Sequence, residues 1–269
     1  MQDAVPINTA AVRSVTDAFC LMQKVRALFM SAREDIVKVR VKFSKVGPLK
    51  FIGHLDMMRY FQKAIRRSGI AICYSTGFSP HQIMSFAAPL GVGVESLGEY
   101  FDIEVSQVST SEEMIAALNA EMAEGVVIEG MCILPDNAKN AMASVQAASY
   151  EVHFDGAYEA DASLPEWIAC LLNEESYIYT KEGKKGKGPI EKDIRPAIFD
   201  LKLLDNKTLY MLVDASSASK LKHGAVVEAL YGYGGDSAAL PSFRVLRLDT
   251  FTRDEAGCLI PLGDVGNSF

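Results

Sequence analysis

Residues 43–86 read FSKVGPLKFIGHLDMMRYFQKAIRRSGIAICYSTGFSPHQIMSF. This stretch contains two of the four histidines of the chain, His54 and His81, and the densest positive charge in it. Apolar and basic residues alternate along 36–44, which predicts a half-buried strand. Residues 54–67 have the apolar period of an amphipathic helix. The organisation of the first half of the chain, and most of its functional information, depends on this stretch.

Positive charge is confined to one block of an otherwise acidic chain. Residues 38–80 hold nine basic side chains against one acid, Asp56. Residues 86–180 hold 17 acids against one base, Lys139. The net charge of all 269 residues is −7, which argues against nucleic acid binding by the chain as a whole. The basic block nevertheless indicates a local surface for an anion.

The cysteines are widely spaced and show no CxxC or Cys/His ligand pattern. They are Cys20, Cys73, Cys132, Cys170 and Cys258. We therefore predict reduced thiols, no metal site and no cofactor. No apolar run approaches the ~20 residues that cross a bilayer, and the N-terminus lacks a secretory pattern. We therefore expect a cytoplasmic location.

Residues 1–35 predict a helical N-terminal appendage, because apolar residues recur in it at steps of three and four. A second interpretation stays open, in which Met30 is the true start and residues 1–29 are not translated.

The order of the remaining elements predicts the fold class. Strands are expected at 36–44, 70–75, 83–88, 98–105, 126–134, 148–154, 176–181, 195–204, 207–214 and 242–250, and helices at 54–67, 109–122, 163–173 and 217–231. Each half approximates β-α-β-β-α-β, the order of the split βαβ unit. We predict an α+β protein of two tandem ferredoxin-like units, 36–135 and 146–269, with antiparallel sheets covered by helices on one face.

The basic residues are candidates for nucleic acid binding. On the predicted helix they fall at i, i+4, i+7 and i+8, which is one side of a helix, and on the strand they alternate along one face. A flexible, glycine-rich loop near residue 185 adds two more. The candidates are Lys42, Lys45, Lys50, Arg59, Lys63, Arg66, Arg67, Lys184 and Lys185. Phe51, Tyr60, Tyr74 and Phe78 are candidate stacking planes for bases. The alternative is a solvated face whose cations pair with acids of the other half.

His54, Asp56 and His81 are the candidate catalytic residues. A pair of histidines suits acid–base cleavage of RNA. Against this, residues two apart on a helix point in different directions, so His54 can instead serve only the helix start.

The same stretch carries a family resemblance. Lys45, Gly47 and Lys50, the HLD run at 54–56, Arg66-Arg67, YSTGFSPH at 74–81 and LGVGVESLGEY at 90–100 resemble the bacterial radical-SAM-linked protein family of unknown function. The match is specific over 37–104 and looser beyond. This chain has Gly53 where members often have Ser, and Gln82-Ile83 where they often have Pro-Lys.

The resemblance implies a function shared with another protein. This chain lacks the CxxxCxxC motif of radical SAM enzymes, so it implies an accessory role beside a cobalamin-binding radical SAM protein. We expect an RNA-binding or substrate-presenting module that acts in RNA modification or processing. An enzyme acting on RNA through His54 and His81, and a purely protein-binding module, remain the alternatives.

Overall fold

A computed structural model describes residues 36–155, 163–181, 188–219, 221–235 and 240–269. The predicted appendage at 1–35 lies outside these residues. No helix among the described residues has the length and apolar character needed to cross a membrane.

Strands and helices alternate along most of the chain. In order they are β1 (Val37–Lys45), η1 (Gly47–Phe51), α2 (His54–Ser68), β2 (Met84–Phe86), β3 (Glu95–Val105), α3 (Ser111–Asn119), β4 (Val126–Ile133), α4 (Ala141–Ser144), β5 (Ala147–Phe154), α5 (Leu164–Asn173), β6 (Ile178–Lys181), β7 (Ile190–Asp193), η2 (Arg195–Ala197), β8 (Ile198–Asp205), β9 (Thr208–Asp214), α6 (His223–Gly232), β10 (Phe243–Arg253), β11 (Leu259–Pro261) and η4 (Leu262–Val265).

The main sheet is a single nine-stranded mixed sheet, and this corrects the predicted fold class. Its path is β4-β1-β3-β10-β5-β9-β8, with β2 on β3 and β11 on β10. Neighbours in it are antiparallel except β3 and β10, which run parallel through Leu246 opposite Glu95 and Arg247 opposite Ser96. The prediction of two tandem ferredoxin-like units with antiparallel sheets is therefore wrong. The strands of both halves share one sheet across this parallel joint.

The parallel joint needs very close contact between the two backbones. A Cβ at Gly98 of β3 would lie 2.5 Å from the Asp249 Cα of β10. That distance is shorter than any side chain tolerates, so only glycine fits there.

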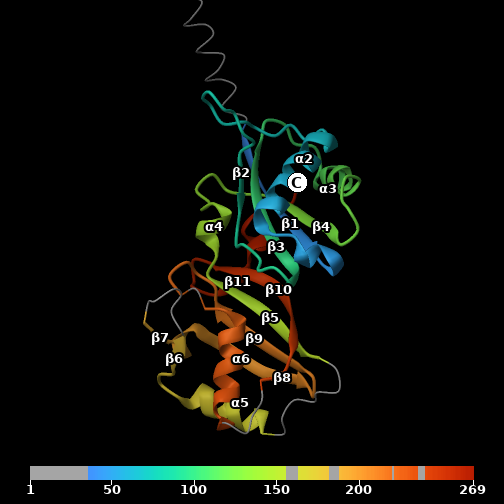
Figure 1. Cartoon of the computed structure of the whole chain (residues 1–269). Coiled ribbons are helices and arrows are strands. Elements are labelled where there is room, and N and C mark those ends of the chain that lie inside the picture. The colour runs from blue at the N-terminus through green and yellow to red at the C-terminus, as the bar shows by residue number, and fades with distance from the viewer. Residues whose placement is uncertain (1–35, 156–162, 182–187, 220, 236–239) are drawn as a thin grey trace, which may run out of the picture.

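The helices form two groups, with α2 and α3 in the upper half of Figure 1 and α5 and α6 in the lower half. The two largest apolar cores of the described residues correspond to these groups. Phe43, Phe61 and Phe101 anchor the core under α2 and α3. Val152, Leu209 and Val226 belong to the core under α5 and α6. Large buried side chains of this kind each contribute about 1.5–3 kcal/mol to stability.

Helix α2 is amphipathic and ends cleanly. Met57, Phe61, Ala64 and Ile65 are buried. Its C-cap, Gly69, has φ 77°, the left-handed conformation that commonly ends a helix. The burial of these four residues therefore determines which side of α2 faces solvent.

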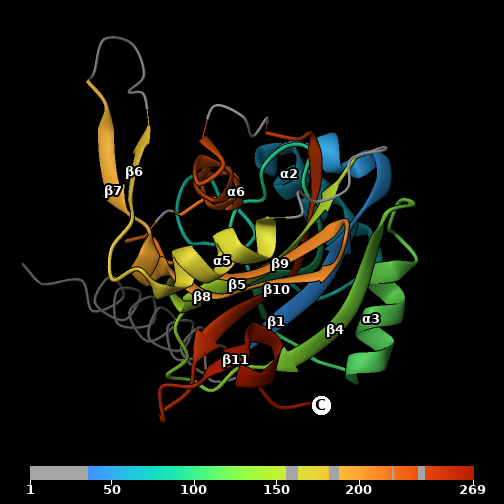
Figure 2. The same ribbon diagram turned by 90° about the horizontal axis from the view of Figure 1, so that it is seen from below.

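The β6–β7 hairpin is a separate two-stranded sheet that projects from the body (Figure 2). The predicted strand at 70–75 is wrong, since only single bridges form there, at Ile72 and Tyr74.

Candidate functional site

The loop that follows β1 is bonded to the end of β1 and to the start of β3. Lys45 is 3% exposed, and its Nζ donates to the Ile52 carbonyl at 2.7 Å. The Gly47 amide donates to Glu95 Oε1 at 2.8 Å, and Lys50 Nζ lies 3.7 Å from the same oxygen. Lys45 and Lys50, which were predicted to bind nucleic acid, therefore make intramolecular contacts instead.

A buried ion pair joins the two halves of the sheet. Arg247 of β10 donates to Glu99 Oε1 of β3 at 2.8 Å, and both side chains are at most 7% exposed. Arg247 also donates to the Tyr150 hydroxyl at 3.3 Å, and its guanidinium lies 5.5 Å from the centre of that ring. The pair thus connects β3, β10 and β5.

A histidine at the start of a helix lies at each end of this ion pair. His54 begins α2 and packs edge-on against Phe86, with ring centres 5.4 Å apart. Burial lowers the pKa of His54, Glu99 opposes this shift and Lys45 adds to it. His223 begins α6, and its ring centre lies 5.5 Å from that of Tyr150.

The lowered pKa favours the neutral form of both rings. Burial, Arg247 and Lys222 lower the pKa of His223 to about 4. We call this group the central polar cluster; its members are Lys45, His54, Glu99, Tyr150, His223 and Arg247.

The three predicted catalytic residues do not form one constellation. Asp56 is exposed and pairs with Arg59 at 3.2 Å. His81 is exposed, and its Nδ1 lies 2.8 Å from the Ser75 hydroxyl. No hydrogen bond or ion pair within the described ranges joins His54, Asp56 and His81. Their catalytic role stays a prediction, and the geometry lends it no support.

The outer face of α2 carries the predicted cations. Arg59, Lys63, Arg66 and Arg67 are all exposed. Arg67 pairs with Glu121 of the segment after α3. In the part of the chain that the structure describes, neither Lys63 nor Arg66 has an acidic partner.

An exposed aromatic loop lies beside this face. The Gln82 amide donates to the Gln62 carbonyl of α2 at 3.2 Å, which holds the 74–82 loop against the helix. Residues three or four positions apart share one side of a helix, so Arg59 and Arg66 lie on the side of Gln62. Tyr74 is 48% exposed and Phe78 fully exposed. We call Arg59, Arg66, Tyr74 and Phe78 the α2 surface.

The other stacking candidates lie elsewhere. The Tyr60 hydroxyl accepts a hydrogen bond from the Ala123 amide, so that ring is part of the packing of α2 on the segment after α3. Phe51 is 66% exposed and lies at the opposite end of α2.

The expected basic face of β1 is not an open surface. Arg40 is fully buried and pairs with Asp102 through two hydrogen bonds, of 2.8 and 3.0 Å. Lys42 Nζ lies 2.7 Å from Asp249 Oδ2 and lines a cavity of about 520 Å³ with Arg40 and Tyr100. The expectation that the strand cations form an exposed face is wrong for Arg40. Lys184 and Lys185 lie outside the described residues.

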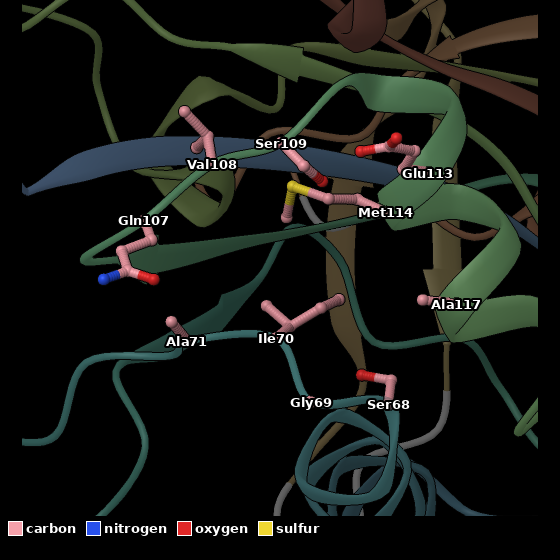
Figure 3. A pocket seen from close by; sticks show the side chains of 10 residues that line it. All are labelled: Ser68, Gly69, Ile70, Ala71, Gln107, Val108, Ser109, Glu113, Met114 and Ala117. Atoms are coloured by element: carbon pink, nitrogen blue, oxygen red, sulfur yellow. The ribbon is translucent and has the colours of Figure 1, made fainter.

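A smaller cavity of about 230 Å³ lies between the end of α2 and the start of α3 (Figure 3). Ser68, Ile70 and Met114 line it, and Glu113 is its one charged side chain. None of the predicted site residues lines it.

Sequence reasoning missed most of the central polar cluster. Glu99 and Arg247 occupy positions of strands whose neighbours are apolar, as in FRVLRLDTF at 243–251. A charge at a buried strand position signals a partner, because such a charge is rarely buried unpaired. That signal was present in the sequence, but it does not show which residue is the partner of Glu99 or of Arg247. Within the described residues, no group of three or more His, Cys, Asp or Glu side chains is placed to hold a metal ion.

The fold and the site together define a mixed α+β protein with a buried charge cluster at its centre and a cationic, aromatic surface outside it. A family model described as "uncharacterized protein conserved in bacteria (DUF2344)" matches residues 38–223. The chain belongs to that family. A search of curated proteins found no match.

Proposed function

We propose that this protein is an RNA-binding module that presents RNA to a radical SAM enzyme, and that the α2 surface holds the RNA. The observation that supports this most is the position of Phe78. Phe78 is fully exposed, in a loop that is hydrogen-bonded to the helix carrying Arg66, which has no acidic partner among the described residues. An exposed ring and an arginine on neighbouring segments suit a base and its phosphate.

The chemistry of the α2 surface favours a single strand. Aromatic rings stack on unpaired bases, which a duplex does not offer. Arginine binds phosphate through two parallel hydrogen bonds and also stacks on bases. Tyr74 and Phe78 would supply the rings, and Arg59 and Arg66 the charge.

RNA binding is tested by fluorescence anisotropy with a labelled single-stranded oligoribonucleotide. We expect affinity to fall steeply between about 50 and about 200 mM salt, because phosphate contacts release counterions. Phe78→Ala should weaken binding by about 1–3 kcal/mol through lost stacking. Arg66→Ala should weaken it and lower the salt slope by about one.

Arg67→Ala is the matched control on the same helix. Arg67 adjoins Arg66 in sequence but is paired with Glu121, away from the Gln62 side. We expect it to change RNA affinity less than Arg66→Ala. Equal binding by the unmodified protein and a Phe78→Ala/Arg66→Ala double variant would overturn the proposal, and absence of RNA binding would favour a protein-binding module.

The radical SAM partner in this proposal is supported by the resemblance of the motif stretch and by an apolar cluster at the other end of α2. Phe51, Leu55 and Val92 are each at least 65% exposed. The Gly93 amide donates to the Lys50 carbonyl at 2.9 Å, which brings the residues beside Phe51 and Val92 together. Exposed apolar groups of this kind mark contact surfaces for proteins.

The partner is tested by size-exclusion chromatography with the cobalamin-binding radical SAM protein of the same cell. We expect one co-eluting species, and its loss in Leu55→Asp, because a charge would be buried at the contact. A Lys202→Gln variant, changed on an exposed part of β8, should co-elute normally. Separate elution of the two unmodified proteins would contradict the proposed complex.

A further inference from the structure

A second concave site lies in the other half of the molecule, between the β6–β7 hairpin and the start of α6. Its volume is about 290 Å³. One part of its wall is apolar, from Tyr179, Ile190, Ile194 and Leu221. The Tyr179 hydroxyl donates to Glu228 of α6, which fixes the ring against the helix.

The charges around this cavity favour an anion. Its lining includes Lys181, Lys192 and Lys222, against one acid, Glu228. Glu228 is already engaged by Tyr179. Three ammonium groups and one carboxylate leave a net charge of +2 at the wall. A dianion would neutralise it.

The start of α6 adds to this field. The N-cap residue is Lys222, no side chain of the described residues caps the helix, and its first turn has no acid. Helix N-termini carry a partial positive charge, so a lysine there is unfavourable without an anion. The Nδ1 atom of His223, which lines the cavity, is buried and has no hydrogen-bond partner among the described residues.

We propose that this cavity binds a ribonucleoside monophosphate, with the phosphate between Lys192, Lys222 and the first amides of α6. The base lies on the apolar wall formed by Tyr179, Ile190 and Leu221. Three observations converge on this ligand class: the cationic lining, the apolar part of the wall, which includes the Tyr179 ring, and a volume close to the lower limit of ligand pockets. The site is separate from the α2 surface and does not depend on RNA binding there.

The test is a calorimetric titration of the full chain with adenosine 5′-monophosphate. We expect saturable binding with one site, and a dissociation constant raised about tenfold or more by Lys222→Gln or by Lys192→Gln, since each removes a charge-assisted contact. Adenosine, which lacks the phosphate, should not bind measurably. Inorganic phosphate should bind more weakly than the nucleotide, because it leaves the apolar wall uncovered.

Lys202→Gln is the matched control, because Lys202 is an exposed lysine of β8 paired with Asp200. It should leave the dissociation constant unchanged. Equal affinity of the unmodified chain and Lys222→Gln, or no binding of the nucleotide, would overturn the proposal. Arg66→Ala should not affect nucleotide binding. The test of this cavity can therefore fail independently of the test of RNA binding at the α2 surface.

A 5′-phosphorylated dinucleotide distinguishes the two sources of such a ligand. Binding as tight as that of the mononucleotide assigns the cavity to the end of an RNA strand. Weaker binding of the dinucleotide assigns it to a free nucleotide.

Discussion

Replacing Glu99 with glutamine is expected to lower the free energy of unfolding by about 3–5 kcal/mol, because it leaves Arg247 buried without its counter-charge. Lys45 also loses the one acid that opposes the burial-induced lowering of its pKa. The shape of the side chain is kept, so the loss is electrostatic. Urea unfolding at pH 7, followed by circular dichroism, measures the change.

Substitution of Arg247, the other member of the ion pair, should lower the free energy of unfolding by less. In Arg247→Met the Glu99 carboxylate keeps Lys45 nearby, so one compensating cation remains. Asp200→Asn breaks an exposed pair with Lys202 and should cost under about 1 kcal/mol. A Glu99→Gln variant as stable as Asp200→Asn would show that the ion pair contributes little to the joint between β3 and β10.

The second large effect is expected at Arg40. Arg40→Met should cost about 3–5 kcal/mol, because Asp102 is left buried without a partner. Arg40 also donates to the Leu262 carbonyl at 3.2 Å and the Lys139 carbonyl at 3.4 Å. The same unfolding measurement applies.

A double variant separates these contributions. Arg40→Met with Asp102→Leu removes the unpaired carboxylate but still removes the arginine that donates to both carbonyls, of which the Lys139 carbonyl keeps the Ser144 hydroxyl as a donor. We expect it to regain part of the lost stability and to remain below the unmodified protein by about 1 kcal/mol for each lost hydrogen bond. Full recovery would mean that the contacts to residues 139 and 262 are unimportant. Arg59→Met, in an exposed pair with Asp56, is the control and should be nearly neutral.

Local periodicity was enough to predict most elements. The predicted helix at 54–67 is α2, and the predicted strands at 126–134 and 148–154 are β4 and β5. Such patterns depend on neighbours in sequence, and these segments have clear apolar periods. The same patterns carry no information on which strand edges meet.

The sheet joint shows this limit. The predicted strand began at residue 98, whereas β3 begins at Glu95. Residues 95 and 96 are the ones that pair with β10, and they follow Gly91 and Gly93, which suggest a loop. The pairing that merges both halves into one sheet was therefore hidden in a segment with no strand pattern.

The candidate site was predictable where exposure follows from one element alone. The period of α2 places its cations outside, and they are exposed. The alternation of β1 places Arg40 and Lys42 on one face but does not tell what covers that face. Contacts with residues 262 and 249, far along the chain, turn those cations inward.

The parallel joint also has a consequence for how the molecule is made. Strand β10 lies between β3 and β5 in the sheet, yet it follows both in the chain. During synthesis, β3 keeps an open edge at Glu95–Ser96 until residues 243–253 leave the ribosome, and open edges invite pairing with other chains. Glu99 likewise has no counter-charge from Arg247 until that residue, 148 positions later in the chain, has been synthesised. Such distant contacts form slowly, so the joint between the two halves is expected to form late.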